Sequence, residues 1–312
     1  MKKKKERAVP PYPWGTSVWL GEDCRRLRES EQILRRRFLA WGAEEISLPC
    51  LEYASVFEEA NAGWDDLFLF SDTDGKTLAL RPELTIPAAR IFAAAMTDRD
   101  LPVRVFYAGE VFRQVLRNTG RTREFRQVGY EVYGGDVSEE DRATVRLAVE
   151  SLRDLGLKDV RIALGDSTLV PALLSAGDET ERETILQSIR RRDRTALGAF
   201  EGGERLVRLL EFGFSPSRSA VESLASDAEF RDAVERLFGV AEFLRGEGIE
   251  VIVDPAMVPV TPYYTGIVFE GVARGHGRPV LVGGRYDNVV GRFGPDVPAI
   301  GFSVQLESIL RG

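Results

Sequence analysis

The sequence is short of the residues on which several common kinds of site depend. Its 312 residues include two cysteines and a single histidine, His276. Cys24 and Cys50 have no metal-ligand spacing, and two cysteines cannot build a disulfide framework. One histidine gives little support for a zinc site or a serine–histidine triad. These shortages predict a protein of the reducing cytoplasm that holds no metal.

Long apolar runs and an excess of positive charge are also lacking. No apolar run approaches the roughly 18 residues that a membrane helix needs. The basic start, residues 1–14, has no apolar stretch behind it, so we expect a flexible solvated tail and no secretory signal. The net charge of -7 does not favour nonspecific nucleic-acid binding, which depends on an excess of positive charge. We therefore expect no membrane insertion.

Patterns of apolar residues indicate helices and β-hairpins in one chain. Residues 68–80 hold two apolar runs around a turn rich in Asp and Gly, and residues 103–133 hold two longer strands. Residues 263–273 also alternate like a strand. Ser138 followed by Asp141 predicts the start of a helix. Antiparallel hairpins flanked by helices predict an α+β fold.

One long region lacks strand-like alternation. Residues 167–248 are helical in pattern, rich in charge and alanine, and interrupted by glycines. We interpret them as a helical insertion into a core formed by residues 15–166 and 249–312. With 44% hydrophobic residues, the chain suits one large or two modest domains.

A polar pattern follows the stretch REFRQVGYEVYGG. With a period of two, Gln127, Gly129 and Glu131 share one face of this strand. The missing side chain of the glycine predicts a hollow between an amide and a carboxylate. The preceding strand places Tyr107 and Arg113 on one face in the same way. Such polar residues more often form a solvated strand face, so a solvated surface and a small-molecule pocket both remain open.

Five segments resemble the catalytic domain of class II histidyl-tRNA synthetases in order and approximate spacing. They are ALRPELT (79–85), GEVFRQV with GRTREFRQVGYEVYG (109–134), YYTGIVFEG (263–271), VGGRYD (282–287) and PAIGFSVQLESI (298–309). The resemblance extends from about residue 15 to residue 310. It implies a class II synthetase-like antiparallel sheet flanked by helices, with a helical insertion.

The resemblance also implies a pocket for histidine. At matching positions, Glu83, Thr85 and Gln127 would hold the α-amino group. Glu131 and Tyr264 would hold the imidazole, because a carboxylate and a phenol can hydrogen-bond its two ring nitrogens. The other residues expected in the histidine pocket are Arg113, Tyr263 and Tyr286.

The positions that activate histidine in the synthetases are not all kept. Arg113 and Arg121 match two arginines of motif 2, but Pro259 and Ser308 stand where the synthetases carry arginines. Arg311 lies about one helical turn beyond Ser308. Losing one preorganised charge donor costs roughly a hundredfold in rate, so we expect binding without adenylate formation. The sequence also ends where synthetases continue into an anticodon-binding domain, so we expect no tRNA partner.

This combination resembles the regulatory subunits of ATP phosphoribosyltransferase. The resemblance implies a cytoplasmic subunit with no activity or cofactor of its own, which activates a short-form catalytic subunit and mediates feedback inhibition by histidine. It further implies a hetero-octamer built on synthetase-like dimers. The segment around Pro49 matches the dimer-forming motif 1, and it equally fits a plain core strand. An active synthetase core and a paralogue with another ligand are the alternative interpretations.

Overall fold

The computed structural model describes residues 12–59, 67–117, 121–174, 178–225 and 227–311. The strands are β1 Glu44–Glu45, β2 Leu51–Tyr53, β3 Phe68–Ser71, β4 Thr77–Leu80, β5 Val103–Phe112, β6 Glu124–Tyr133, β7 Arg161–Asp166, β8 Glu250–Val253, β9 Ile267–Val272, β10 Leu281–Arg285 and β11 Ala299–Gln305. The helices are α1 Gly21–Ala40, α2 Ala54–Glu59, α3 Thr85–Ala95, α4 Val137–Asp154, α5 Leu169–Leu173, α6 Glu179–Arg190, α7 Arg194–Leu197, α8 Gly203–Glu211, α9 Arg218–Glu222, α10 Ala228–Gly246, α11 Asp287–Val290 and α12 Leu306–Leu310. Within these ranges no helix combines the length and apolarity that crossing a membrane requires. Most of the predicted N-terminal tail lies outside the described residues.

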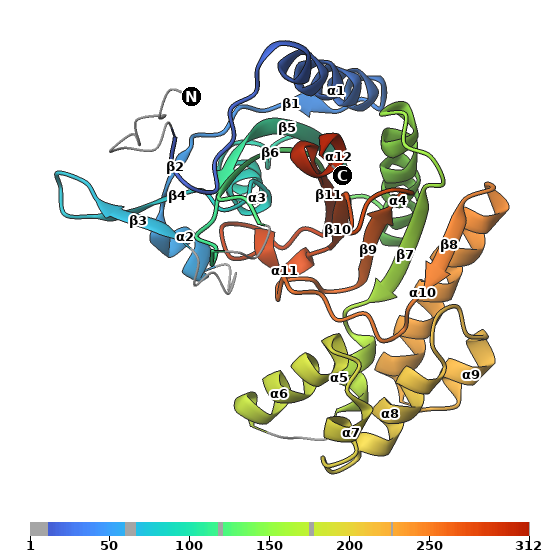
Figure 1. Cartoon of the computed structure of the whole chain (residues 1–312). Coiled ribbons are helices and arrows are strands. Elements are labelled where there is room, and N and C mark those ends of the chain that lie inside the picture. Colours follow the sequence, from blue (N-terminus) through green and yellow to red (C-terminus); the bar gives the residue numbers. More distant parts are fainter. Residues whose placement is uncertain (1–11, 60–66, 118–120, 175–177, 226, 312) are drawn as a thin grey trace, which may run out of the picture.

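An eight-stranded sheet forms the centre of the molecule (Figure 1). Its strand order is β1-β5-β6-β11-β10-β9-β7-β8. The pairs from β5 to β7 are antiparallel, while β1 joins β5 and β8 joins β7 in parallel. A second, three-stranded sheet holds the predicted hairpin in the order β2-β4-β3. The predicted α+β fold with a mostly antiparallel sheet is therefore confirmed.

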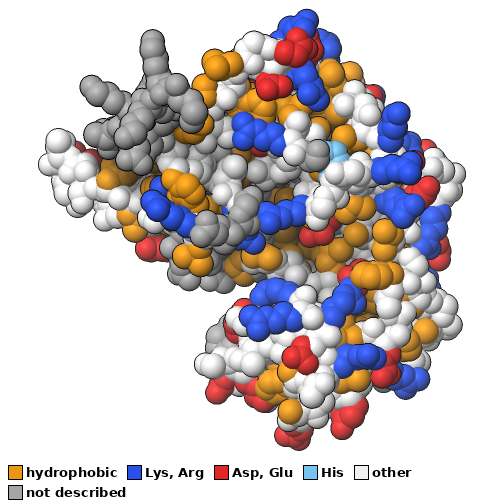
Figure 2. Space-filling view, viewed as in Figure 1, with side chains coloured by type: hydrophobic (Ala, Val, Ile, Leu, Met, Phe, Trp, Pro, Cys, Tyr) orange, Lys and Arg blue, Asp and Glu red, His pale blue; other side chains and the backbone are white. Residues whose placement is uncertain are grey.

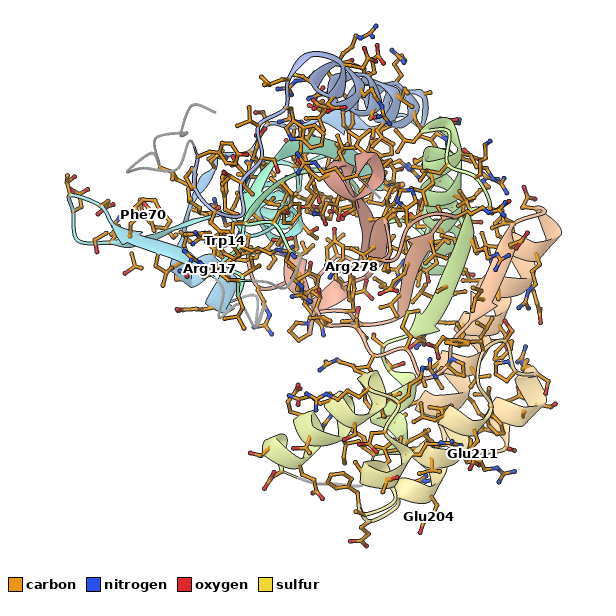
Figure 3. The ribbon with its side chains drawn as sticks, in the orientation of Figure 1. Trp14, Phe70, Arg117, Glu204, Glu211 and Arg278 are labelled. Atoms are coloured by element: carbon orange, nitrogen blue, oxygen red, sulfur yellow. The ribbon has the colours of Figure 1, made fainter. Side chains whose placement is uncertain are left out.

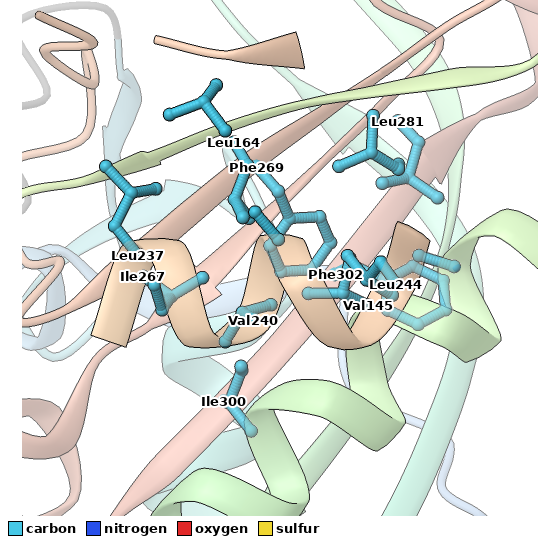
Figure 4. Close-up of a cluster of buried hydrophobic side chains, with 14 of the residues drawn as sticks. Val145, Leu164, Leu237, Val240, Leu244, Ile267, Phe269, Leu281, Ile300 and Phe302 are labelled. Carbon is cyan, nitrogen blue, oxygen red and sulfur yellow. The ribbon is translucent and has the colours of Figure 1, made fainter. Parts of the chain in front are cut away.

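Alternation along β6 separates the two faces of the large sheet. Val128, Tyr130 and Val132 are buried in the main hydrophobic core, together with residues of α1, α4 and α10. Figure 4 shows the apolar side chains of β7, β9, β10 and β11 gathered against α10 and α4. Residues 127, 129 and 131 consequently face the opposite side of the sheet.

The opposite side is covered by α2, α3 and α11. Their apolar residues form a second core with the end of β6, in which the rings of Phe92 and Tyr133 stack 4.3 Å apart. The helix α3 is short and rich in alanine, which lets its backbone approach the sheet closely. The candidate site lies on this side.

Helices α5–α9 form what we call the helical lobe, which projects beside the sheet core (Figure 1). The chain enters the lobe from β7 and returns through α10, which packs against β7, β8 and α4. In the described residues between β7 and β8, every regular element is a helix. The exact division into core and insertion stays a prediction, because α10 shares the main core with the sheet.

Two local predictions are wrong by a few residues. The cap of α4 is Asp136, whose Oδ1 accepts from the Glu139 N–H at 2.9 Å, and not Ser138. Tyr263 and Tyr264 precede β9 and lie on a loop, not on a strand. The prolines before them disfavour regular pairing, since proline has no N–H to donate to a ladder.

Candidate functional site

A cavity of about 830 Å³ opens on the α3 side of the sheet. All eight predicted site residues line it: Glu83, Thr85, Arg113, Gln127, Glu131, Tyr263, Tyr264 and Tyr286. The space-filling view also shows a hollow between the sheet core and the helical lobe, with basic side chains along it (Figure 2). The fold thus gathers residues from widely separated segments into one site.

Glu131 lies at the inner end of the cavity and has no exposed surface. It stands on β6 directly opposite Gly301 of β11. A Cβ atom at position 301 would overlap the Glu131 carboxylate. The carboxylate therefore lies over the glycine, in space that a larger residue would fill.

Three hydroxyl groups hold the Glu131 carboxylate. Thr85 Oγ1 donates to Oε1 at 2.9 Å, Tyr107 OH donates to Oε1 at 2.7 Å, and Tyr286 OH donates to Oε2 at 2.6 Å. An ionised carboxylate offers about four acceptor positions. One position on Oε2 is left for a donor on a ligand.

Burial makes two carboxyl groups of the site easy to protonate when no ligand cation is near. Desolvation raises the pKa of Glu131 to about 7, against the hydrogen bonds from its three hydroxyl partners. Desolvation likewise raises the pKa of Glu83 to about 7. A bound ammonium group would favour the ionised form of both. The inner end is therefore suited to a cationic or donor-rich ligand.

Glu83 lies two residues before α3, and its side chain accepts hydrogen bonds from the start of that helix. Its Oε2 accepts from the Thr85 N–H at 2.7 Å, and its Oε1 accepts from the Ile86 N–H at 2.9 Å. These amides belong to the first turn of the helix, where backbone donors lack intrahelical partners. The carboxylate is thus fixed in orientation while still lining the cavity.

Gln127 supplies an acceptor that the protein does not use. Its Oε1 atom is buried and has no hydrogen-bond partner among the described residues. Buried polar atoms in proteins almost always have a partner. Because Gln127 lines the cavity beside the two carboxylates, this oxygen is available to an N–H group of a ligand.

Tyr286 is held in place by the ion pairs of the buried Arg285, which lie outside the cavity. The neighbouring Arg285 is only 3% exposed and donates two hydrogen bonds to Asp141 Oδ1, at 2.9 Å and 2.6 Å. It also pairs with Asp287 at 2.8 Å. In the VGGRYD segment, the arginine and the aspartate are therefore structural, and the tyrosine reaches the site.

Tyr263 and Tyr264 form an aromatic wall with Tyr286. The ring centroids of Tyr263 lie 5.3 Å from Tyr264 and 6.0 Å from Tyr286. A Cβ atom at Gly284 would lie 2.7 Å from the Tyr264 ring, so this glycine lets the loop approach β10. The wall can pack against a flat ring.

Arginines stand at the outer part of the cavity. Arg113 donates to Pro82 O at 2.8 Å, and its guanidinium lies 5.2 Å from the Phe125 ring centroid. Arg311 lies 4.2 Å above the Trp19 ring and donates to a serine hydroxyl at 2.7 Å. Arg278, labelled in Figure 3, is exposed and also lines the cavity.

No role in the site was assigned to Tyr107 or His276 from the sequence. Tyr107 completes the set of hydroxyls around the Glu131 carboxylate, although the pattern had already placed it on the correct strand face. Its ring fills the space at Gly129, so the hollow predicted at that glycine is wrong, and the cavity lies beside it. His276 also lines the cavity, and its Nδ1 lies 3.1 Å from Ser308 O.

The chemistry of the inner end is that of a receptor for a small, nitrogen-rich molecule. It combines two carboxylates, an unused amide oxygen and an aromatic wall. Across the described ranges, no group of three or more His, Cys, Asp or Glu side chains is arranged to hold a metal ion. The hydrogen-bond acceptors instead suit an ammonium group and a planar ring with N–H groups.

The chain is similar to known proteins over nearly its whole length. A family model described as histidyl-tRNA synthetase matches residues 15–309. The ATP phosphoribosyltransferase regulatory subunit of Moorella thermoacetica is 36% identical over 324 residues, an alignment that covers 96% of this chain and 80% of that protein.

Two solved structures are similar over nearly the whole chain. A protein of Bacillus halodurans described as an ATP phosphoribosyltransferase regulatory subunit/histidyl-tRNA synthetase has a TM-score of 0.87 and 28% identity, covering 99% of this chain and 84% of that one. A histidine–tRNA ligase subunit of Alicyclobacillus acidocaldarius has a TM-score of 0.85 and 29% identity, covering 98% and 97%.

Proposed function

Because the chain belongs to the ATP phosphoribosyltransferase regulatory subunits, within the histidyl-tRNA synthetase family, we propose that it binds free L-histidine in this cavity. Histidine binding then changes the activity of a short-form catalytic subunit, which acts at the first step of histidine biosynthesis. The chain itself performs no chemistry. Dimers of this chain within a hetero-octamer, and a cytoplasmic location, are parts of the same proposal.

The proposal rests on the environment of the Glu131 carboxylate. Three hydroxyls fix it and one acceptor position remains, in a fully buried setting. The imidazole N–H of histidine fits that position, with the tyrosine wall against its ring. Glu83 and the unused oxygen of Gln127 fit the α-ammonium group. Each partner is an acceptor, as an ammonium group requires.

Calorimetry on the purified chain tests the ligand. L-histidine should bind, L-glutamine should not, and histamine should bind more weakly because it lacks the carboxylate. A thermal-shift screen of amino acids gives an independent readout, since a ligand of the native state raises its apparent stability. Stabilisation by another amino acid and none by histidine would refute the assignment.

A second experiment tests the regulatory role. The chain is mixed with a short-form catalytic subunit, and phosphoribosyl transfer is followed as histidine is added. The wild-type chain should activate the partner and make it sensitive to histidine. Glu131→Gln should retain activation and lose sensitivity. If that variant stayed sensitive to histidine, feedback inhibition would not depend on histidine bound in this cavity.

An active synthetase core is the second candidate, because Arg113, Arg121, Arg278 and Arg311 all line the cavity. Against it, proline and serine occupy positions 259 and 308, and Arg311 is engaged by the Trp19 ring. Loss of two charge donors should lower the rate of adenylate formation by about 10⁴ or more. We expect no histidine-dependent pyrophosphate–ATP exchange. Measurable exchange would show that the chain is an active synthetase core.

A further inference from the structure

The loop between β8 and β9, residues 254–266, carries two of the cavity tyrosines, and we call it the tyrosine loop. It begins with an Asp-Pro turn in which Asp254 Oδ1 accepts from the Ala256 N–H at 3.1 Å. At its far end the Thr265 N–H donates to Arg285 O at 2.8 Å. The loop is thus anchored to the sheet core on the side next to the cavity.

The helical lobe holds the other side of the tyrosine loop. Arg192 Nη2 donates to Asp254 Oδ2 at 2.5 Å, and only 7% of Asp254 is exposed. Arg190 Nη2 donates to Pro259 O at 3.1 Å. Both arginines belong to the end of α6 and the turn after it. The tyrosine loop, which lines the cavity, is therefore attached to the lobe at two points.

The turn that presents Arg192 is itself held in an uncommon conformation. Arg192 has a φ of 53°, in the left-handed region that residues other than glycine rarely adopt. Its guanidinium lies 4.5 Å from the Phe214 ring centroid, within the lobe. Unfavourable conformations of this kind persist where the surroundings fix them, and they concentrate at functional sites.

We propose that Arg192 is a positioning residue of the histidine site. Through Asp254 it holds the tyrosine loop, and with it Tyr263 and Tyr264, against the bound ligand, while Arg190 provides the second attachment. This inference rests on the proposed function and names the part of the chain that regulates the same site. Since coupling between sites is reciprocal, a partner that moves the helical lobe must change the affinity for histidine.

Histidine titrations of the full chain by calorimetry test this coupling. The variants are Arg192→Ala, Asp254→Asn and the double variant, and Asp254→Asn keeps an oxygen for the Ala256 N–H. Arg218→Ala is the matched control, because Arg218 is also a lobe arginine but pairs with Glu222 at 2.7 Å. Arg192→Lys tests whether a cation at this position restores binding.

Arg192→Ala should weaken histidine binding about tenfold, within the range usual for coupled sites. The double variant should bind no more weakly than the weaker single variant, because both changes remove one contact. Arg192→Lys should recover part of the affinity, and Arg218→Ala should leave it unchanged. Unchanged affinity in a folded Arg192→Ala, or additive losses in the double variant, would overturn the inference.

Amide hydrogen exchange on the wild-type chain decides the matter if Arg192→Ala does not fold. Histidine should slow exchange at residues 190–193 of the lobe as well as in the tyrosine loop, and no slowing in the lobe would overturn the inference. If the wild-type chain does not bind histidine, the proposed function fails and this inference fails with it. Binding without coupling removes the inference alone.

Discussion

Replacing Glu131 with glutamine should have opposite effects on histidine binding and on the stability of the empty protein. The change preserves shape and leaves one oxygen to accept from Thr85 and Tyr107. It turns Oε2, which carries the free acceptor position and the contact with Tyr286, into an NH₂ donor. A ligand N–H would then face another donor.

The magnitudes follow from the surroundings of this carboxylate. Losing a hydrogen bond to a buried charged acceptor, and leaving a donor unpaired, costs about 2–3 kcal/mol, or roughly 30- to 150-fold in affinity. Burial raises the pKa of Glu131 to about 7 from 4.5. At about 1.4 kcal/mol per pKa unit, ionisation of this group destabilises the empty folded state by about 3 kcal/mol.

The sign of the stability effect depends on pH. A carboxyl whose folded pKa lies above its unfolded pKa binds more protons in the native state, so the wild-type protein loses stability between about pH 4.5 and 7 and changes little above that. Glu131→Gln lacks this loss. The free energy of unfolding of the variant relative to wild type should therefore rise through that interval and then level off.

Two measurements check the argument. Calorimetric titration at pH 7.5 gives the affinity for histidine, and urea denaturation at pH 5, 6 and 7.5 gives the free energy of unfolding of the empty protein. Weak binding together with reduced stability at every pH would mean that the variant is misfolded at this site. Unchanged affinity would refute the role assigned to Glu131.

Three further outcomes are expected. Gly301→Ala should abolish detectable histidine binding, because its Cβ would overlap the Glu131 carboxylate, while Gly246→Ala, with open space around the new methyl, should not; tight binding by the Gly301 variant would contradict the described geometry. Because a bound ammonium group favours ionised carboxylates, the two carboxyls with pKa values of about 7 should release protons on histidine binding at pH 6, seen by calorimetry in buffers of different ionisation enthalpy. Proton release that is the same in Glu131→Gln would show that the Glu131 carboxyl contributes none of it. Arg285→Lys removes the two-nitrogen contact with Asp141 and should lower the free energy of unfolding by about 1–3 kcal/mol; an unchanged denaturation midpoint would show that the pair adds nothing.

The strands and the faces they present could be predicted because alternation is a local property of sequence. The period of two along β6 placed Gln127 and Glu131 on one side, and they do line the cavity. The same rule could not show that Tyr107 stands opposite Gly129. That pairing depends on the register of β5 against β6, which no single strand contains. The predicted hollow is accordingly filled by a tyrosine ring.

Contacts across long stretches of sequence were beyond prediction for the same reason. Arg285 and Asp141 are 144 residues apart, and Arg192 and Asp254 are 62 residues apart. Helical periodicity shows which side of α6 is polar, but it does not show which loop that side meets. The pattern predicted the helices of the lobe, and their link to the cavity emerged only from the tertiary structure.

The two halves of the cavity are suited to different tasks. Glu83, Gln127 and Glu131 stand on or next to paired strands and a capped helix, so their positions change little and they can select the ligand. Tyr263 and Tyr264 stand on a loop whose far side is fastened to the helical lobe. A ligand shifts an equilibrium only through different affinities for two states. If the rigid half alone bound histidine, both states of the subunit would bind it equally and no signal could reach a partner. Under the proposed function we therefore infer that the sensitivity to assembly lies in the tyrosine loop, where the lobe can alter one wall of the cavity and leave the acceptors in place.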